Sequence, residues 1–214
     1  MPNYRVISNR FLTPETFVLR TERPEVDIRA GQCFSVGSSE LAINREYSMY
    51  SAAHDPYVDF LVRKIDGGRV STALSKLRTG DEIQISGPYG DFCLNEDAIS
   101  RQKHIFIASG TGIAPFHSFV KTYPALEFEL FHGVRHENET YDHTIYPKNS
   151  YKSYVSRPPT GKTGSYVTDG LKNRNISPNE VFYICGNRQM IIDTISILRE
   201  KGIHGDAIFT ETFF

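Results

Sequence analysis

Short alternations of apolar and polar residues dominate the first half of the chain. In the clearest one, residues 57–65, Val58, Phe60 and Val62 occupy alternate positions, which makes one face of a strand apolar. Similar runs recur between turn-forming residues. We predict strands at residues 4–8, 16–21, 32–37, 45–51, 57–65 and 81–87.

One helix is predicted among these strands, at residues 71–77. Ser71 is its predicted N-cap, and Ala73, Leu74 and Leu77 form an apolar stripe at helical spacing. Several short strands at this spacing, with a single helix, are typical of a small antiparallel β-barrel.

From about residue 101 the pattern changes. Residues 104–110 form a continuous apolar run that ends in glycine, as buried parallel strands do. Further strands are predicted at residues 126–133 and 180–186.

Helices are predicted between and after these strands. One covers residues 116–123, with Pro115 suited to a first turn, and the clearest covers 187–202, with Asn187 as its cap and Gly202 at its end. Alternating strands and helices predict an α/β domain with a parallel sheet, whose ligands bind at the carboxyl ends of the strands. We therefore predict two domains, at residues 1–100 and 101–214.

Composition narrows the classes of protein. The chain has 214 residues, 39% of them hydrophobic, and Lys plus Arg (24) nearly balance Asp plus Glu (25), giving a net charge of −1. This balance argues against a nucleic-acid partner. Cys33, Cys93 and Cys185 are far apart and no CxxC occurs, which argues against a disulfide framework, a zinc ribbon or a cysteine-bound cluster. No apolar run approaches a membrane span, so we expect a cytoplasmic protein with no membrane partner.

The stretch REYSMYS, residues 45–51, carries groups suited to phosphates and flat rings. In a strand, Arg45 and Tyr47 share one face while Ser48 lies on the other. A guanidinium suits a diphosphate, and a phenol ring suits a flat ligand. Taken alone, the stretch is more typical of an exposed arginine and ordinary sheet tyrosines.

The turn GGRVST, residues 67–72, comes directly before the predicted helix. Two glycines permit close approach of a ligand, and Ser71 and Thr72 add hydroxyl groups. Any glycine turn before a helix has this appearance, but together with Arg45 it supplies both halves of a phosphate clamp.

Two glycine-containing stretches follow buried strands in the second half. SGTGIAP, residues 109–115, opens a helix, the setting in which dinucleotide phosphates are held, although it is not GxGxxG. In YICGN, residues 183–187, Cys185 and Gly186 would lie at the same sheet edge. Near the chain end, Glu211 could relay a proton or pair with a cation; burial in a last strand is the alternative.

Two other groups of residues have less specific interpretations. His132, His136 and His143 match no standard metal spacing. The stretch from Lys148 to Arg174 is strongly basic, which suits a solvated face, a nucleotide phosphate or an acidic protein.

The order of these motifs resembles the ferredoxin–NADP reductase superfamily. The motifs that show this resemblance are RxYS at Arg45–Ser48, GxxS at Gly68–Ser71, GPYGDF at 87–92, GTGIAP at 110–115, CGN at 185–187 and the acidic-aromatic tail. The resemblance spans nearly the whole chain. It implies an FAD-binding antiparallel barrel followed by an NAD(P)-binding α/β domain, and its closest pattern is that of the bacterial ferredoxin/flavodoxin reductases.

The resemblance also implies residue roles toward FAD. Arg45 would contact the diphosphate, Tyr47 would pack on the flavin and Ser48 would lie near its N5 atom. The GxxS turn would cap the diphosphate, and the terminal aromatics would cover the flavin and its adenine. The remaining FAD-binding residues implied in this way are Gly68, Val70, Ser71, Thr72, Phe213 and Phe214.

Toward the nicotinamide nucleotide, the resemblance implies a cradle at Gly110, Thr111 and Gly112. Cys185 and Gly186 would flank the nicotinamide, and Glu211 matches the family's C-terminal glutamate. Together with Ser48, Cys185 and Glu211 are the implied catalytic residues.

The chain departs from the family pattern at two positions. Arg188 stands where the bacterial reductases commonly have proline after CGN, and Tyr166 stands where NADP-dependent members often have arginine. Arg157, Lys162 or Arg188 could compensate in a 2′-phosphate site. The choice between NADPH and NADH therefore stays open.

From these observations we expect an FAD-dependent NAD(P)H oxidoreductase. A hydride would pass between NAD(P)H and flavin N5, and single electrons would pass to or from a separate carrier such as ferredoxin or flavodoxin. The alternatives are a reductase of free flavin and an electron-transfer subunit of a larger complex.

Overall fold

The computed structural model describes residues 2–38, 42–177 and 179–212. The chain divides into two compact units, Met1–Cys93 with Ala114–Tyr123 and Leu94–Ile113 with Pro124–Phe214. No helix in the described ranges is long and apolar enough to cross a membrane. The domain limits predicted at residues 100 and 101 stay a prediction.

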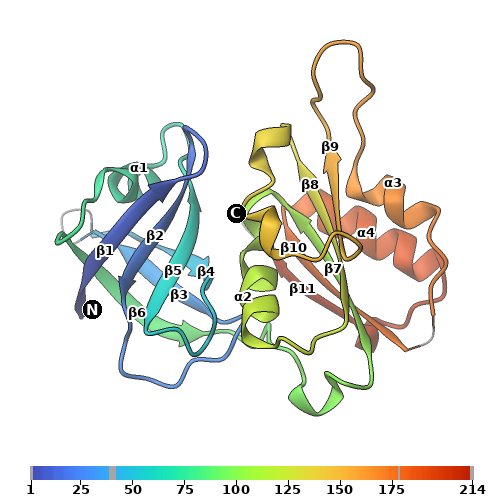
Figure 1. Cartoon of the computed structure of the whole chain (residues 1–214), viewed down its shortest axis with the longest axis horizontal. Coiled ribbons are helices and arrows are strands. Elements are labelled where there is room, and N and C mark those ends of the chain that lie inside the picture. The colour runs from blue at the N-terminus through green and yellow to red at the C-terminus, as the bar shows by residue number, and fades with distance from the viewer. Residues whose placement is uncertain (1, 39–41, 178, 213–214) are drawn as a thin grey trace. The chain divides into compact units, whose positions relative to one another are not determined.

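The first unit contains a six-stranded antiparallel sheet, as predicted. Its strands hydrogen-bond in the order β4-β3-β6-β1-β2-β5, and an isolated antiparallel bridge between Met49 and Phe60 joins the two ends of this order, which closes a small barrel. Figure 1 shows the strands in blue to green, with α1 beside them. Their bounds are Asn3–Phe11 (β1), Thr16–Glu22 (β2), Cys33–Gly37 (β3), Asn44–Ser48 (β4), Tyr57–Arg63 (β5) and Glu82–Tyr89 (β6), and α1 covers Arg69–Lys76.

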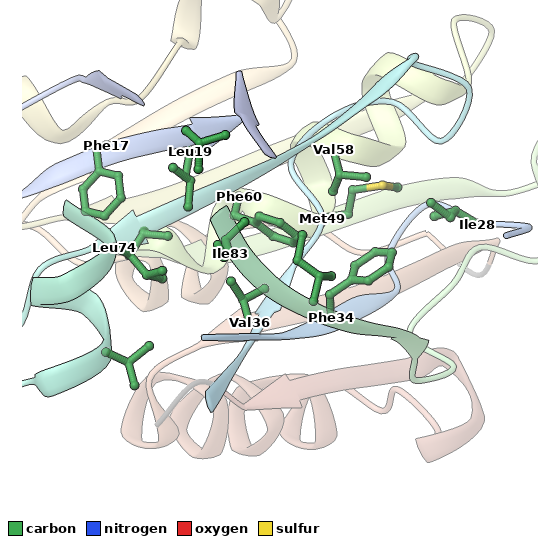
Figure 2. Close-up of a cluster of buried hydrophobic side chains, with 14 residues drawn as sticks. Phe17, Leu19, Ile28, Phe34, Val36, Met49, Val58, Phe60, Leu74 and Ile83 are labelled. Carbon is green, nitrogen blue, oxygen red and sulfur yellow. The ribbon is translucent and has the colours of Figure 1, made fainter. Parts of the chain in front are cut away.

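The barrel core consists of the alternate residues that the pattern indicates. Val58, Phe60 and Val62 of β5 are fully buried, and Leu74 of α1 joins them. Figure 2 shows Val58, Phe60 and Leu74 among side chains of the other strands, including Phe34, which packs edge-on against Phe60 with ring centroids 5.9 Å apart. Burial of this apolar surface is the main stabilising contribution in the unit.

Helix α2, Ala114–Thr122, belongs to the first unit although it follows a strand of the second. The ring of His117 stacks on Tyr50 with centroids 3.6 Å apart, and its Nδ1 lies 2.6 Å from the Tyr50 carbonyl oxygen. Lys121 donates to Asp55 at 2.8 Å. These contacts fasten the helix to the barrel.

The second unit contains a five-stranded parallel sheet in the order β11-β10-β7-β8-β9. Apolar residues of the sheet pack against α3 and α4, which lie on one of its faces (Figure 1). The bounds are Lys103–Ser109 (β7), Phe128–Val134 (β8), Tyr151–Val155 (β9), Glu180–Gly186 (β10), Ile208–Thr212 (β11), Val167–Lys172 (α3) and Arg188–Glu200 (α4), with single-turn helices at Glu96–Ala98 (η1), Gly110–Ile113 (η2), Glu137–Glu139 (η3), His143–Ile145 (η4) and Gly205–Ala207 (η5).

Candidate functional site

Strand β4 places Arg45 and Tyr47 on one face. In its register with β3, Val36 lies opposite Arg45 and Phe34 opposite Tyr47, and both β3 residues are fully buried. Residues directly opposite in an antiparallel pair share a face, so Arg45 and Tyr47 share the face that turns toward the barrel core. The predicted common face is therefore confirmed by the register.

The two side chains differ in exposure. The Tyr47 ring packs against Phe60 with centroids 6.5 Å apart, and burial raises the pKa of its phenol to about 12. The Arg45 guanidinium is exposed, and its Nη1 donates to the Asn44 carbonyl at 2.9 Å. Ser48, opposite Cys33, is buried. An exposed cation thus lies next to a flat ring at the barrel surface.

The glycine turn before α1 has a different cap from the predicted one. The N-cap is Gly68, so the prediction of Ser71 as the cap is wrong. Ser71 lies inside the first turn, where its Oγ accepts the Ile65 N–H at 3.2 Å and so holds the turn in place. Gly67 has φ +71°, a conformation that favours glycine.

A groove of about 850 Å³ lies against this turn. Gly68 and Thr72 line it, whereas Val70 and Ser71 are buried beneath it. A Cβ atom on Gly68 would stand 2.9 Å from the Ile65 carbonyl oxygen, so the turn tolerates no side chain there. Arg69 and Lys76 bring positive charge to the lining, and Asp81 and Glu82 bring negative charge. The small residues and the hydroxyl of Thr72 fit a diphosphate that approaches the backbone closely.

In the second unit, the Gly110–Ile113 turn follows β7 and closes on the end of β10. A Cβ atom on Gly112 would overlap the Cys185 carbonyl group, and Gly110 has φ +55°. The structure therefore brings the predicted nucleotide-binding residues Gly110, Thr111 and Gly112 to the sheet edge that carries Cys185 and Gly186. Parallel strands place their ligands at this edge.

Cys185 and Glu211 are neighbours across two parallel strands. The register of β10 with β11 pairs them directly, and the Cys185 thiol donates to the Glu211 carboxylate at 3.8 Å. Burial and, to a lesser degree, the neighbouring carboxylate raise the pKa of Cys185 well above its usual value. The thiol therefore stays protonated, as a proton donor beside a carboxylate.

Ser109, the first residue of the SGTGIAP stretch, makes contacts that the sequence does not indicate. Its Oγ accepts hydrogen bonds from both the backbone N–H and the side-chain amide of Asn187, each at 2.9 Å. Asn187 also caps α4 through Met190 N–H at 2.9 Å, which confirms its predicted capping role. Ser109 thus ties the turn after β7 to the turn after β10.

Arg157 lies apart from this group of residues, exposed in the segment after β9. Its backbone N–H donates to the Arg135 carbonyl at 2.8 Å. The two arginines therefore lie side by side, just after the ends of the neighbouring strands β8 and β9. Arg135 is exposed as well, and sequence motifs do not indicate it. Tyr166, at the position where arginine was expected, is 60% exposed. Phe213 and Phe214 lie outside the described residues.

An antiparallel barrel with a glycine turn at its helix, together with a parallel sheet with glycine turns at its carboxyl edge, is the architecture of flavin- and nicotinamide-nucleotide-binding oxidoreductases. Residues 6–93 match the family model of the oxidoreductase FAD-binding domain, and residues 106–195 match that of the oxidoreductase NAD-binding domain. The chain belongs to the ferredoxin–NADP reductase superfamily.

Individual relatives agree with this assignment. The chain is 30% identical over 183 residues to the toluate 1,2-dioxygenase electron transfer component of Pseudomonas putida, covering 79% of this chain but only 54% of the relative. It is 25% identical over 231 residues to a ferredoxin–NADP reductase of Pseudomonas aeruginosa, covering 93% and 89%. A crystal structure of a ferredoxin–NADP reductase from Neisseria gonorrhoeae, with bound FAD and NADP, has the same fold with a TM-score of 0.85 at 24% identity, covering 100% and 98%.

Proposed function

We propose that this chain is an FAD-dependent oxidoreductase that exchanges reducing equivalents between NADH or NADPH and a separate one-electron carrier, such as ferredoxin or flavodoxin. The observation that carries the proposal is the convergence of Gly110–Gly112, Cys185–Gly186 and Glu211 at one edge of the parallel sheet. Two of these segments, Gly110–Gly112 and Cys185–Gly186, lie so close together that there is no room for a Cβ atom on Gly112. A bound nucleotide can therefore contact both segments.

In the first unit, we assign the holding of FAD to residues of β4 and of the turn before α1. Arg45 would bind the diphosphate, Tyr47 would pack on the flavin ring and Ser48 would lie at its edge. Gly68 and Thr72 offer the diphosphate a close backbone approach and a hydroxyl, while Val70 and Ser71 support the turn from below. Bound FAD would supply the chemistry, accepting a hydride and releasing electrons singly. At the end of the chain, we assign to Phe213 and Phe214 the role of covering the flavin. This assignment rests only on the resemblance to the family.

In the second unit, Gly110–Gly112 would cradle the nucleotide and Cys185–Gly186 would border the nicotinamide. The Cys185 thiol donates a hydrogen bond to Glu211 and keeps its proton, so the pair can hold a proton at a buried position beside the reacting ring. We assign Cys185 and Glu211 to this proton-holding role and to positioning, with the redox chemistry left to the flavin.

Coenzyme choice would depend on Arg135 and Arg157. Both guanidinium groups are exposed near the ends of adjacent parallel strands, where the 2′-phosphate of NADPH can meet two cations. The acidic residues Glu137 and Glu139 lie in the same segment and oppose this preference. The proposal therefore names these arginines as the determinants and leaves the preferred coenzyme to measurement.

The test is a visible spectrum of the purified protein under anaerobic conditions, before and after stoichiometric NADPH or NADH. A yellow protein that either nucleotide bleaches supports the proposal, and the faster nucleotide is the preferred coenzyme. A protein that stays colourless after incubation with FAD contradicts it. A yellow protein that neither nucleotide bleaches points instead to an electron-transfer subunit of a larger complex, an alternative favoured by the similarity to the electron transfer component of toluate 1,2-dioxygenase from Pseudomonas putida.

A cytoplasmic location is part of the proposal. Cys33, Cys93 and Cys185 are all free thiols, which suits a reducing compartment. We also propose that the functional domains follow the limits 1–100 and 101–214.

A further inference from the structure

His132 is a fully buried histidine at the carboxyl end of β8, and both of its ring nitrogens have partners. Nδ1 lies 2.9 Å from the hydroxyl oxygen of Tyr151 on β9. Nε2 lies 2.9 Å from the carbonyl oxygen of Gly110, the first residue of the turn after β7. One imidazole thus links a neighbouring strand to the candidate nucleotide-binding turn.

The partners determine the tautomer of this ring. A carbonyl oxygen only accepts hydrogen bonds, so Nε2 carries the proton that is donated to Gly110. In the neutral ring Nδ1 is then an acceptor, and the Tyr151 hydroxyl donates to it. Burial lowers the pKa of His132 to about 4, which keeps the ring neutral near pH 7. The rings of Tyr141 and Tyr151 and the carboxylate of Glu139 are the other titratable groups that face it.

The bond to Gly110 has a consequence for the next residue. In a trans peptide the C=O and N–H groups point in opposite directions, so a carbonyl held toward His132 turns the Thr111 N–H away from it. Gly110 has φ +55° and no side chain to restrict rotation of this peptide. A rotated peptide would present a carbonyl oxygen, rather than an N–H donor, to an anionic ligand.

The two ends of this turn are fixed by other contacts. Ser109 accepts two hydrogen bonds from Asn187, and Gly112 packs directly against the Cys185 carbonyl. The Gly110–Thr111 peptide between them is held by His132. We propose that His132, oriented by Tyr151, is a positioning residue that fixes the Gly110–Thr111 peptide so that the Thr111 N–H faces the nicotinamide nucleotide. This inference rests on the proposed function of the turn.

The experiment compares four variants of the full chain with FAD bound. H132F keeps an aromatic ring but removes both hydrogen bonds, while H132Q keeps an N–H donor at the distance of Nε2. Y151F removes only the hydroxyl that orients the ring. H204Q is the matched control, because His204 is an exposed histidine of the same unit. FAD content, thermal unfolding and the dissociation constants of NADP⁺ and NAD⁺ are measured for each.

We expect H132F to weaken binding of the preferred nucleotide by about tenfold or more, because misplacing a positioning group can cost up to about a hundredfold. FAD content stays at the wild-type level. H132Q restores most of the affinity, Y151F shows a smaller loss and H204Q binds like the wild type. A nitrogen-15 NMR spectrum of the wild type shows His132 as the neutral tautomer with the proton on Nε2.

The outcomes separate the inference from the proposed function. If the wild type binds neither nucleotide, the proposed function fails and the inference fails with it. If the wild type binds a nucleotide and H132F binds it within about twofold, the proposed function stands and the inference alone is overturned. Equal losses in H132Q and H132F, or a proton on Nδ1 in the wild type, also overturn it. The NMR result and Y151F decide the matter even if H132F does not fold.

Discussion

At the residue scale, Arg45 combines an exposed guanidinium with a position next to the half-buried ring of Tyr47. Its Nη1 donates to the neighbouring Asn44 carbonyl, and its other donors can turn to a ligand. We expect R45A to lower the fraction of protein purified with FAD and to weaken FAD binding about tenfold, because charge-assisted bonds to phosphate contribute about 1.5–3 kcal/mol. Absorbance at the flavin band per protein measures this.

R5A is the matched control for R45A. Arg5 is exposed on β1 of the same unit and, although it lies opposite Glu82, it does not itself line the groove. Wild-type FAD content in R45A, or an equal loss in R5A, would remove Arg45 from the flavin site.

Glu211 accepts a hydrogen bond from the buried thiol of Cys185, which is the contact from which we propose its role. We expect E211Q to retain FAD but to lower turnover with NAD(P)H by about a hundredfold or more, because a general acid–base group contributes about 10²–10⁴-fold. Steady-state rates and flavin absorbance together measure this. E200Q, an exposed glutamate at the end of α4, should turn over like the wild type, and an unchanged rate in E211Q would exclude the role.

His132 makes stability depend on pH in a defined direction. Burial lowers its pKa from 6.5 to about 4 in the folded state, so the unfolded chain binds more protons between these values. The stabilising contribution is complete above about pH 6.5 and is lost as the pH falls through about 4, up to about 3 kcal/mol in total. Urea unfolding of the wild type and H132Q across this range measures it. H132Q should show a shallower decline, and identical declines would contradict the assignment.

At the scale of elements, the turn after β7 and the end of β10 depend on each other through Gly112. A methyl group at this position would overlap backbone atoms of Cys185, which cannot move without disturbing the sheet. We expect G112A to lower the free energy of unfolding by about 1–3 kcal/mol and to weaken nucleotide binding, while FAD stays bound. Thermal unfolding and nucleotide titration measure the two effects.

The control for this turn is G205A. A Cβ atom on Gly205 would meet no atom within 4 Å, so the same change of residue type should leave both measurements near wild-type values. Full nucleotide affinity in G112A would show that the close contact is not needed for binding.

The elements that the sequence predicts well are those whose periodicity continues over many residues. The alternation in β5 and the cap of α4 at Asn187 have the predicted positions. Strand β9 and helix α3 are five and six residues long, too short for a period to be evident, and α3 contains Gly170. Ser71 is a favourable cap by residue type, but the cap lies three residues earlier, at Gly68, because Gly67 and Gly68 form the turn.

In the candidate site, the sequence likewise indicates some of the residues but not the contacts between them. Residue types and motif order indicate Arg45, Cys185 and Glu211. Their contacts depend on long-range register: Cys185 meets Glu211 because α4 returns the chain to the neighbouring parallel strand. His132 carries no motif at all, and its bond to Gly110 depends on the pairing of β8 with β7. Spacing along the sequence does not encode such contacts.

At the scale of the whole molecule, the net charge of −1 hides an uneven distribution. The basic stretch from Lys148 to Arg174 is only partly available to ligands. Arg174, 12% exposed, donates to Glu180 at 2.6 Å and also bonds Glu129, which raises its pKa further above the usual range. Lys152 lies 3.8 Å from Glu129. The exposed remainder, including Lys148 and Arg157, is where an acidic partner or a phosphate would meet positive charge.

This distribution leads to a prediction about the electron acceptor. We expect the FAD-bound protein to reduce ferricyanide with NAD(P)H at a rate that added free flavin does not change, because the proposed clamp of Arg45 and the α1 turn would retain FAD.

Reduction of cytochrome c should require added ferredoxin or flavodoxin. It should slow as salt rises from about 0.05 to 0.5 M, since screening weakens association between charged surfaces. A rate that depends on added FAD or FMN would instead identify a reductase of free flavin. A carrier-dependent rate that salt does not change would show that the exposed basic residues take no part in docking.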